Sequence, residues 1–128
     1  MEKHKFQILT SWRKAYDLMT EVYQQTWHFP PYEFYYLTAQ LRNAVKSVVE
    51  YIADGHERRD KKERLLSLSG AGDALELVRI FLKRAHNLHY VVENQFTELE
   101  TKRQEIGRLL RDLTVSLPAN RNKEVGND

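Results

Sequence analysis

The chain contains no cysteine, only five glycines and three prolines, and no long apolar run. Without cysteine it can form no disulfide, thiolate nucleophile or cysteine-based zinc site. No segment approaches the roughly 18 consecutive apolar residues that a membrane-spanning helix needs, and the polar residues 1–5 are not followed by the apolar stretch of a signal peptide. These absences predict a cytoplasmic protein without a membrane anchor.

Charged and apolar residues are both plentiful. Of 128 residues, 41% are hydrophobic and 30% are charged, with 20 Lys and Arg against 18 Asp and Glu and a formal net charge of +2. Such a mixture supports a real core and excludes a wholly disordered acidic or basic tail protein. The length fits one small domain.

Apolar residues recur every three or four positions in four long segments, whereas none shows the sustained alternation of a strand. The predicted helices cover residues 11–28, 32–53, 61–88 and 93–117. Short connections between long helices favour an all-α fold, an antiparallel up-down-up-down four-helix bundle spanning residues 1–117. The polar residues 118–128 are predicted to form a disordered tail.

Capping residues predict where three of these helices begin or end. Thr10 or Ser11 can accept hydrogen bonds from the first free N–H groups of the first helix. Gly55 can take the left-handed conformation that closes the second helix. Asp60 and Glu63 have the spacing of a capping box, which predicts the start of the third helix.

The periodicity also predicts the core. The first helix is expected to bury an aromatic-rich stripe, made of Trp12, Ala15, Tyr16, Met19, Val22, Tyr23 and either Thr26 or Trp27. The fourth helix places apolar residues at heptad spacing, namely Phe96, Leu99, Ile106, Leu110, Leu113 and Leu117. Arg103 is the one polar residue in that series.

Two glycines lie inside the predicted third helix, at Gly70 and Gly72. Each costs about 1 kcal/mol relative to alanine in a helix interior, so something should offset that cost. Close packing of a neighbouring helix of the same chain is the favoured interpretation. A contact with another subunit, or a kink, is the alternative.

Residue patterns for catalysis are missing. Ser47, Ser67 and Ser69 fall within helices and not at a strand-to-helix elbow, and the chain has no glycine-rich phosphate loop. Glu98 and Glu105 lie two helical turns apart on an expected solvated face, without the Glu-x-x-His pair of di-iron bundles. We therefore expect a protein that is not an enzyme and needs no cofactor.

His86 and His89 are the best candidates for a metal site, because they lie three residues apart at the end of the third helix. Two nitrogens without a nearby third ligand make a poor site. The favoured interpretation is that both histidines, with Lys83 and Arg84, offset the partial negative charge at a helix C-terminus.

Basic residues concentrate in three places, one of which is residues 1–14, where Lys3, Lys5, Arg13 and Lys14 outnumber Glu2 for a local charge of +3. Residues 77–92 contain no Asp or Glu, and the segment between the second and third helices is dense in cations. Such clusters can neutralise phosphates without reading a base sequence, although a solvated surface that keeps a protein soluble has the same composition. The predicted nucleic-acid-binding residues are Arg58, Arg59, Lys61, Lys62, Arg79, Lys83 and Arg84.

Several segments resemble a known family. The stretches WRKAY at 12–16, LRNAVKS at 41–47, YIADG at 51–55, RRDKKE at 58–63 and EIGRLL at 105–110 are similar to bacterial four-helix-bundle proteins encoded by intervening sequences of 23S rRNA genes. Residues 77–88 resemble the basic third helix of one branch, the accessory variability determinant (Avd) of diversity-generating retroelements.

The resemblance implies a non-enzymatic homopentamer. In the Avd branch such a ring binds nucleic acid and a reverse transcriptase, and Arg79, Lys83 and Arg84 match its basic positions. Arg58, Arg59, Lys61 and Lys62 match the family's basic loop. The pair Arg58-Arg59 can instead serve structure, because guanidinium groups bind carbonyls or carboxylates of a neighbouring bundle.

Two functions are consistent with this sequence. The first is a non-catalytic, oligomeric accessory protein that binds RNA or DNA phosphates and docks a reverse transcriptase. The second is a protein–protein scaffold with no nucleic-acid role. The scaffold is favoured by the run Tyr32-Glu33-Phe34-Tyr35-Tyr36, because four aromatic rings in five residues cannot all face one core.

Overall fold

The computed structural model describes the backbone of residues 2–126 and the side chains of residues 4–115. The described part of the chain is almost wholly helical and contains no strand, which confirms the predicted all-α four-helix bundle. Its helices are α1 (Glu2–Thr26), α2 (Ala39–Glu57), α3 (Lys61–Asn87) and α4 (Glu93–Gly126). A 3₁₀ turn (Pro31–Glu33) and a π-helical turn (Phe34–Thr38) separate α1 from α2.

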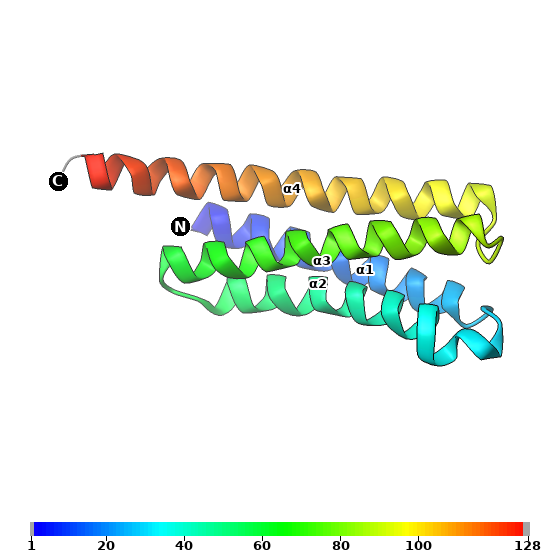
Figure 1. Cartoon of the computed structure of the whole chain (residues 1–128). Coiled ribbons are helices and arrows are strands. Elements are labelled where there is room, and N and C mark those ends of the chain that lie inside the picture. Colours follow the sequence, from blue (N-terminus) through cyan, green and yellow to red (C-terminus); the bar gives the residue numbers. More distant parts are fainter. Residues whose placement is uncertain (1, 127–128) are drawn as a thin grey trace.

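Figure 1 shows the chain reversing direction at each connection, so that the N- and C-termini lie at the same end of the bundle. Each helix packs against two neighbours, in the cyclic order α1, α2, α3, α4. This arrangement leaves every helix with one face toward the core and the opposite face toward solvent. No helix within the described residues is long and apolar enough to cross a membrane.

The core follows the periodicity of the sequence. Each helix contributes side chains that are almost fully buried, including Leu18 and Val22 of α1, Val45 and Ile52 of α2, Leu68 and Leu82 of α3, and Leu99, Ile106, Leu110 and Leu113 of α4. The heptad prediction for the fourth helix is thereby confirmed for those four residues, while the side chain of Leu117 lies outside the described set.

The predicted start of the first helix was wrong. α1 begins at Glu2, and the hydroxyl groups of Thr10 and Ser11 donate 3.0 Å hydrogen bonds to the carbonyl oxygens of Phe6 and Gln7 inside the helix. The physical reason is that Ile8 is fully buried, so the apolar stripe continues toward the N-terminus and holds another two turns in helical form.

The aromatic stripe of the first helix was only partly predicted. Ala15 and Val22 are fully buried, but Trp12 and Met19 are half-buried, and Tyr16 and Tyr23 are exposed. Packing against α2 and α4 covers only the arc that carries the small and aliphatic residues. The larger rings therefore lie along the border of that arc.

The prediction for Gly55 was also wrong. Gly55 lies inside α2, has no left-handed φ, and is buried; the helix ends only where Arg58 takes an extended conformation. A Cβ atom at Gly55 would stand 3.1 Å from Leu68 Cδ2, so the glycine allows α3 to approach α2 closely. The N-cap of α3 is confirmed, because the Glu63 N–H donates to Asp60 Oδ2 at 3.1 Å.

Two other helix boundaries differ from the prediction. The segment from 32 to 38 forms the 3₁₀ and π-helical turns, and Tyr36 has φ −116° and ψ −106°, outside the helical region. These turns bury Leu37 and Thr38 while leaving the aromatic run exposed.

At the C-terminal end of the chain, α4 continues through Pro118 to Gly126, where a disordered tail was predicted. The φ angle of proline is compatible with a helix. Because proline has no N–H, it makes the helix about 3 kcal/mol less stable than alanine would at the same position. The last two residues of that predicted tail lie outside the described residues.

Candidate nucleic-acid interface

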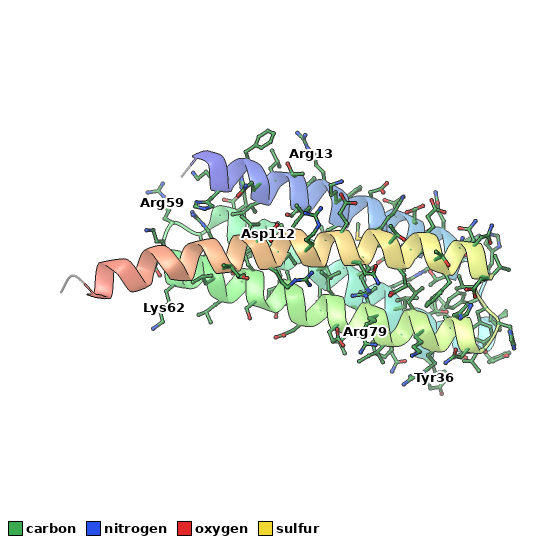
Figure 2. All side chains as sticks on the ribbon, turned by 90° about the horizontal axis from the view of Figure 1, so that it is seen from above. Arg13, Tyr36, Arg59, Lys62, Arg79 and Asp112 are labelled. Carbon is green, nitrogen blue, oxygen red and sulfur yellow. The ribbon has the colours of Figure 1, made fainter. Side chains whose placement is uncertain are left out.

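The predicted basic residues form two separate clusters. Arg58, Arg59, Lys61 and Lys62 lie at the α2–α3 connection, whereas Arg79, Lys83 and Arg84 lie on the second half of α3. At 1.5 Å per residue, Lys62 and Lys83 are about 30 Å apart along α3. In Figure 2, Arg59 and Lys62 lie near one end of the bundle, and Arg79 lies well along α3 toward the other. The structure therefore does not bring the seven residues into one site.

Arg58 has a structural role. Its Nε donates to Asp54 Oδ2 at 3.1 Å, and its NH1 lies 3.7 Å from Glu63 Oε2. Asp54 also accepts a hydrogen bond from the Ser67 hydroxyl. This bond is the main cause, and the bond from Arg58 the second, of a pKa of the Asp54 carboxyl below its ordinary value of 3.8. Arg58 thus links the end of α2 to the first turn of α3, within its own chain.

The carbonyl oxygen of Arg58 has a structural partner too. It accepts a 2.5 Å hydrogen bond from NH2 of Arg64, whose side chain is almost completely buried beneath the connection. A buried guanidinium that binds a loop carbonyl holds the loop in one conformation. The α2–α3 connection is therefore rigidly placed.

Two residues of this connection remain open to a ligand. Arg59 and Lys62 are exposed and form no ion pair with any residue whose side chain is described, and Lys61 is half-buried. A rigid backbone with two exposed cations can neutralise two phosphates with little loss of conformational freedom.

Arg79 is neutralised within the bundle. Its Nε donates to Glu76 Oε1 at 2.8 Å, and its NH2 also contacts that oxygen. On α4, Arg103 binds Glu100 through two hydrogen bonds of 2.7 and 3.0 Å. The hydrogen bond from Arg79, helped by the charge of Arg103, lowers the pKa of Glu76. These four charges form a network between α3 and α4, which explains the polar residue in the α4 heptad series.

Lys83 and Arg84 complete the second cluster as exposed residues. The Arg84 guanidinium carbon lies 5.7 Å from the centre of the Phe81 ring, a cation–π arrangement that leaves its N–H groups available. Lys83 forms no ion pair with the described side chains. The open cations of the two clusters are thus Arg59, Lys62, Lys83 and Arg84.

The histidine pair does not converge on one point. His86 Nε2 lies 2.6 Å from Glu93 Oε2, and its ring stacks on Phe96 with centroids 4.2 Å apart. His89 lies in the α3–α4 connection with a φ of 65°. Within residues 4–115, no group of three His, Asp or Glu side chains could hold a metal ion.

The sequence prediction missed a groove between α1 and α2. It has a volume of about 640 Å³ and is lined by aromatic, polar and methionine side chains between Tyr16 and Gln24 of α1, by Trp27 and His28 in the turn after α1, and by Arg42 of α2. The signal was present in the sequence, because the first helix carries more large rings than a stripe between two neighbours can cover.

Comparison with known proteins adds one match. The sequence model of a family described as 23S rRNA-intervening sequence protein matches residues 7–112 of this chain. A search of curated proteins returned no match.

Proposed function

This chain belongs to the 23S rRNA-intervening sequence protein family, and we propose that it is a non-catalytic, oligomeric protein that binds RNA or DNA phosphates. One observation carries this proposal. Arg59, Lys62, Lys83 and Arg84 are exposed and form no ion pair with any described side chain, whereas Arg58 is paired with Asp54 and Arg79 with Glu76.

The binding mode follows from this distribution of charge. Lysine and arginine at a rigid loop and along one helix contact the phosphate backbone, release condensed counterions and read no base sequence. Assembly multiplies the effect, because each added copy of the chain brings the same two clusters. The proposed assembly is a homopentamer, for which five chains of 15.2 kDa give about 76 kDa.

As a finer proposal, the protein partner is a reverse transcriptase. It is supported by the resemblance of residues 77–88 to the basic third helix of Avd proteins. Co-purification with a reverse transcriptase encoded beside its gene tests this part separately from nucleic-acid binding.

Gel-shift titrations with structured RNA at several salt concentrations test the main proposal. We expect the logarithm of the affinity to fall linearly with the logarithm of salt concentration, and the double variant Lys62→Glu/Lys83→Glu to bind much more weakly. Asp73→Lys provides a control that adds an exposed cation outside both clusters. Absence of binding at low salt, or unchanged binding by the double variant, contradicts the proposal.

A protein–protein scaffold is the second candidate function. It is favoured by the aromatic run in the two turns that precede α2, in which the side chain of Tyr35 is 83% exposed and those of Tyr32, Phe34 and Tyr36 are also exposed. A group of exposed aromatic side chains commonly marks a site of protein–protein contact. Light scattering combined with the Tyr35→Ser/Tyr36→Ser variant tests whether this run holds copies of the chain together.

A further inference from the structure

The α1–α2 groove is unlike the rest of the surface in composition. Its lining contains three large aromatic rings and no carboxylate, and consists of Tyr16, Met19, Thr20, Tyr23, Gln24, Trp27, His28 and Arg42. The groove is separate from both basic clusters, which lie on the α2–α3 connection and on α3. The exposed aromatic rings of this groove are not needed for the helix packing and ion pairs described above.

The three rings form a row along one face of α1 and the turn that follows it, because the Trp27 N–H still donates a 3.1 Å hydrogen bond to the Tyr23 carbonyl oxygen just past the end of the helix. Tyr16, Tyr23 and Trp27 are separated by seven and four residues, the spacing that places side chains one above another on a helix. The row extends about 16 Å at 1.5 Å per residue. Trp27 is 78% exposed, and Tyr16 is 48% exposed although its ring also packs on Trp12 with centroids 5.4 Å apart.

Arg42 fixes one position in this row. Its Nε donates to Thr26 Oγ1 at 2.7 Å and its NH2 donates to the Tyr23 carbonyl oxygen at 3.3 Å. Its guanidinium carbon lies 4.8 Å from the centre of the Tyr23 ring. The groove is therefore preformed, because a charged group bonded to the last turn of α1 holds the middle ring in place.

The charges around the groove favour an anionic ligand. The two carboxylates of the neighbouring part of α1, Asp17 and Glu21, both bind Lys102 on the α4 side of the helix. Arg13 lies one turn before Tyr16, and Lys46 lies one turn after Arg42. Helical spacing puts each cation within one turn of a lining residue, although neither belongs to the lining itself. Both are exposed and form no ion pair with described side chains, and Arg13 projects away from the bundle in Figure 2.

We propose that the α1–α2 groove binds single-stranded RNA or DNA, with bases stacked on Trp27 and Tyr16 and phosphates contacted by Arg13 and Lys46. The proposal rests on the proposed nucleic-acid-binding function and adds to it a second, aromatic site with a preference for unpaired strands. Any base has a flat face for stacking, whereas a duplex hides those faces. An apolar protein helix in the same groove would leave Arg13 and Lys46 without a counter-charge, and it therefore fits less well.

Tryptophan fluorescence can report on this site directly, because the chain has only two tryptophans and Trp12 is half-buried outside the groove lining. In the Trp12→Phe variant, Trp27 is the only tryptophan, and excitation at the red edge of the absorption band avoids the emission of the seven tyrosines. Titration with poly(U) should quench the emission of Trp27, and an RNA duplex of equal length should quench it far less. Tyr16→Ala should weaken poly(U) binding by roughly tenfold, within the range expected for one lost base stack.

Phe6→Ala is the matched control, since it removes an exposed aromatic ring of α1 that lies outside the groove lining and outside the run from Tyr32 to Tyr36, and it should leave the affinity for poly(U) unchanged. Circular dichroism confirms that each variant is folded. If Tyr16→Ala and Trp27→Ala bind poly(U) as the parent does, while Lys62→Glu/Lys83→Glu loses binding, the groove proposal fails and the proposed function survives.

Two further results separate the alternatives. If no variant and no parent protein binds nucleic acid at low salt, the proposed function itself fails, and the groove proposal with it. If Tyr16→Ala and Trp27→Ala leave nucleic-acid binding intact but lower the mass measured by light scattering, the groove is an interface between copies of the chain and the proposal is overturned.

Discussion

The ring of Tyr51 on α2 lies directly against Gly70 on α3. A Cβ atom built at Gly70 would stand 2.6 Å from the nearest ring carbon, a distance that real side chains do not show. This contact accounts for one of the two glycines inside α3 and supports the interpretation that they allow close packing within the chain. Gly72 differs, because a Cβ atom there would meet nothing within 4 Å.

The two glycines should therefore respond in opposite ways to alanine. We expect Gly72→Ala to raise the free energy of unfolding by about 1 kcal/mol through helix propensity alone. Gly70→Ala should lower it by about 1–3 kcal/mol, because the added methyl group forces the Tyr51 ring aside. Urea unfolding at one protein concentration measures both. Adding Tyr51→Ala to Gly70→Ala should restore much of the loss, and equal shifts for the two single variants would contradict this account.

Stability should depend on the Ser67–Asp54 hydrogen bond in a pH-dependent way. This bond, with that from Arg58, lowers the pKa of Asp54 in the folded state below its ordinary value of 3.8. A lowered pKa means that ionised Asp54 stabilises the fold above about pH 5, and that this contribution is lost as the pH falls through the folded-state pKa. Ser67→Ala should thus destabilise the protein at pH 7 and much less at about pH 2.5. Ser69→Ala, an exposed serine on the same helix, should show no such difference in urea unfolding.

Lys83 and Arg79 should differ in their effect on nucleic-acid binding although they lie one turn apart on α3. Lys83 is unpaired with described side chains, whereas Arg79 is held by Glu76. Lys83→Gln should reduce the slope of log affinity against log salt by about one and weaken binding to all sequences alike. Arg79→Gln should change that slope less. Gel shifts at four or more salt concentrations measure the slope for both variants. An equal change in slope for the two would mean that Arg79 contacts phosphates as Lys83 does.

The α3–α4 connection should be stabilised by a glycine at position 89. His89 has a φ of 65°, a conformation that costs a residue with a Cβ atom about 1–2 kcal/mol. His89→Gly should therefore raise the free energy of unfolding by up to about 1 kcal/mol, since glycine's greater freedom in the unfolded chain cancels part of the gain. His28→Gly, an exposed histidine in a turn without positive φ, should give no increase.

Much of the fold could be predicted from local patterns. The spacing of apolar residues identified all four helices and the buried positions Leu99, Ile106, Leu110 and Leu113 of α4, because a helix repeats every 3.6 residues whatever it packs against. Asp60 was recognised as the N-cap of α3 for the same reason, since capping involves residues only a few positions apart. The family resemblance also came from local segments and is confirmed by the match over residues 7–112.

The candidate interface could be predicted only as a list of cations. The ion pairs of Arg58 with Asp54 and of Arg79 with Glu76 join residues four and three positions apart, a spacing that is visible in the sequence. Spacing identifies only neighbours that could pair, whereas the structure shows which pairs form, including pairs between helices such as Lys102 with Asp17. The sequence also could not show that the aromatic residues of α1 line a groove, because their spacing is equally compatible with a buried stripe.

The sequence by itself determined that this protein is a bundle of four helices, since cysteine-free, glycine-poor segments with a helical apolar repeat can bury their surface in few other ways. Only the tertiary structure decided which side chains remain available. The width of the arc that α2 and α4 cover on α1 leaves Tyr16 and Trp27 outside, and the pairing of carboxylates with Arg58, Arg79 and Lys102 leaves the other cations open. Exposure and pairing depend on three-dimensional neighbours, and a local repeat does not encode them.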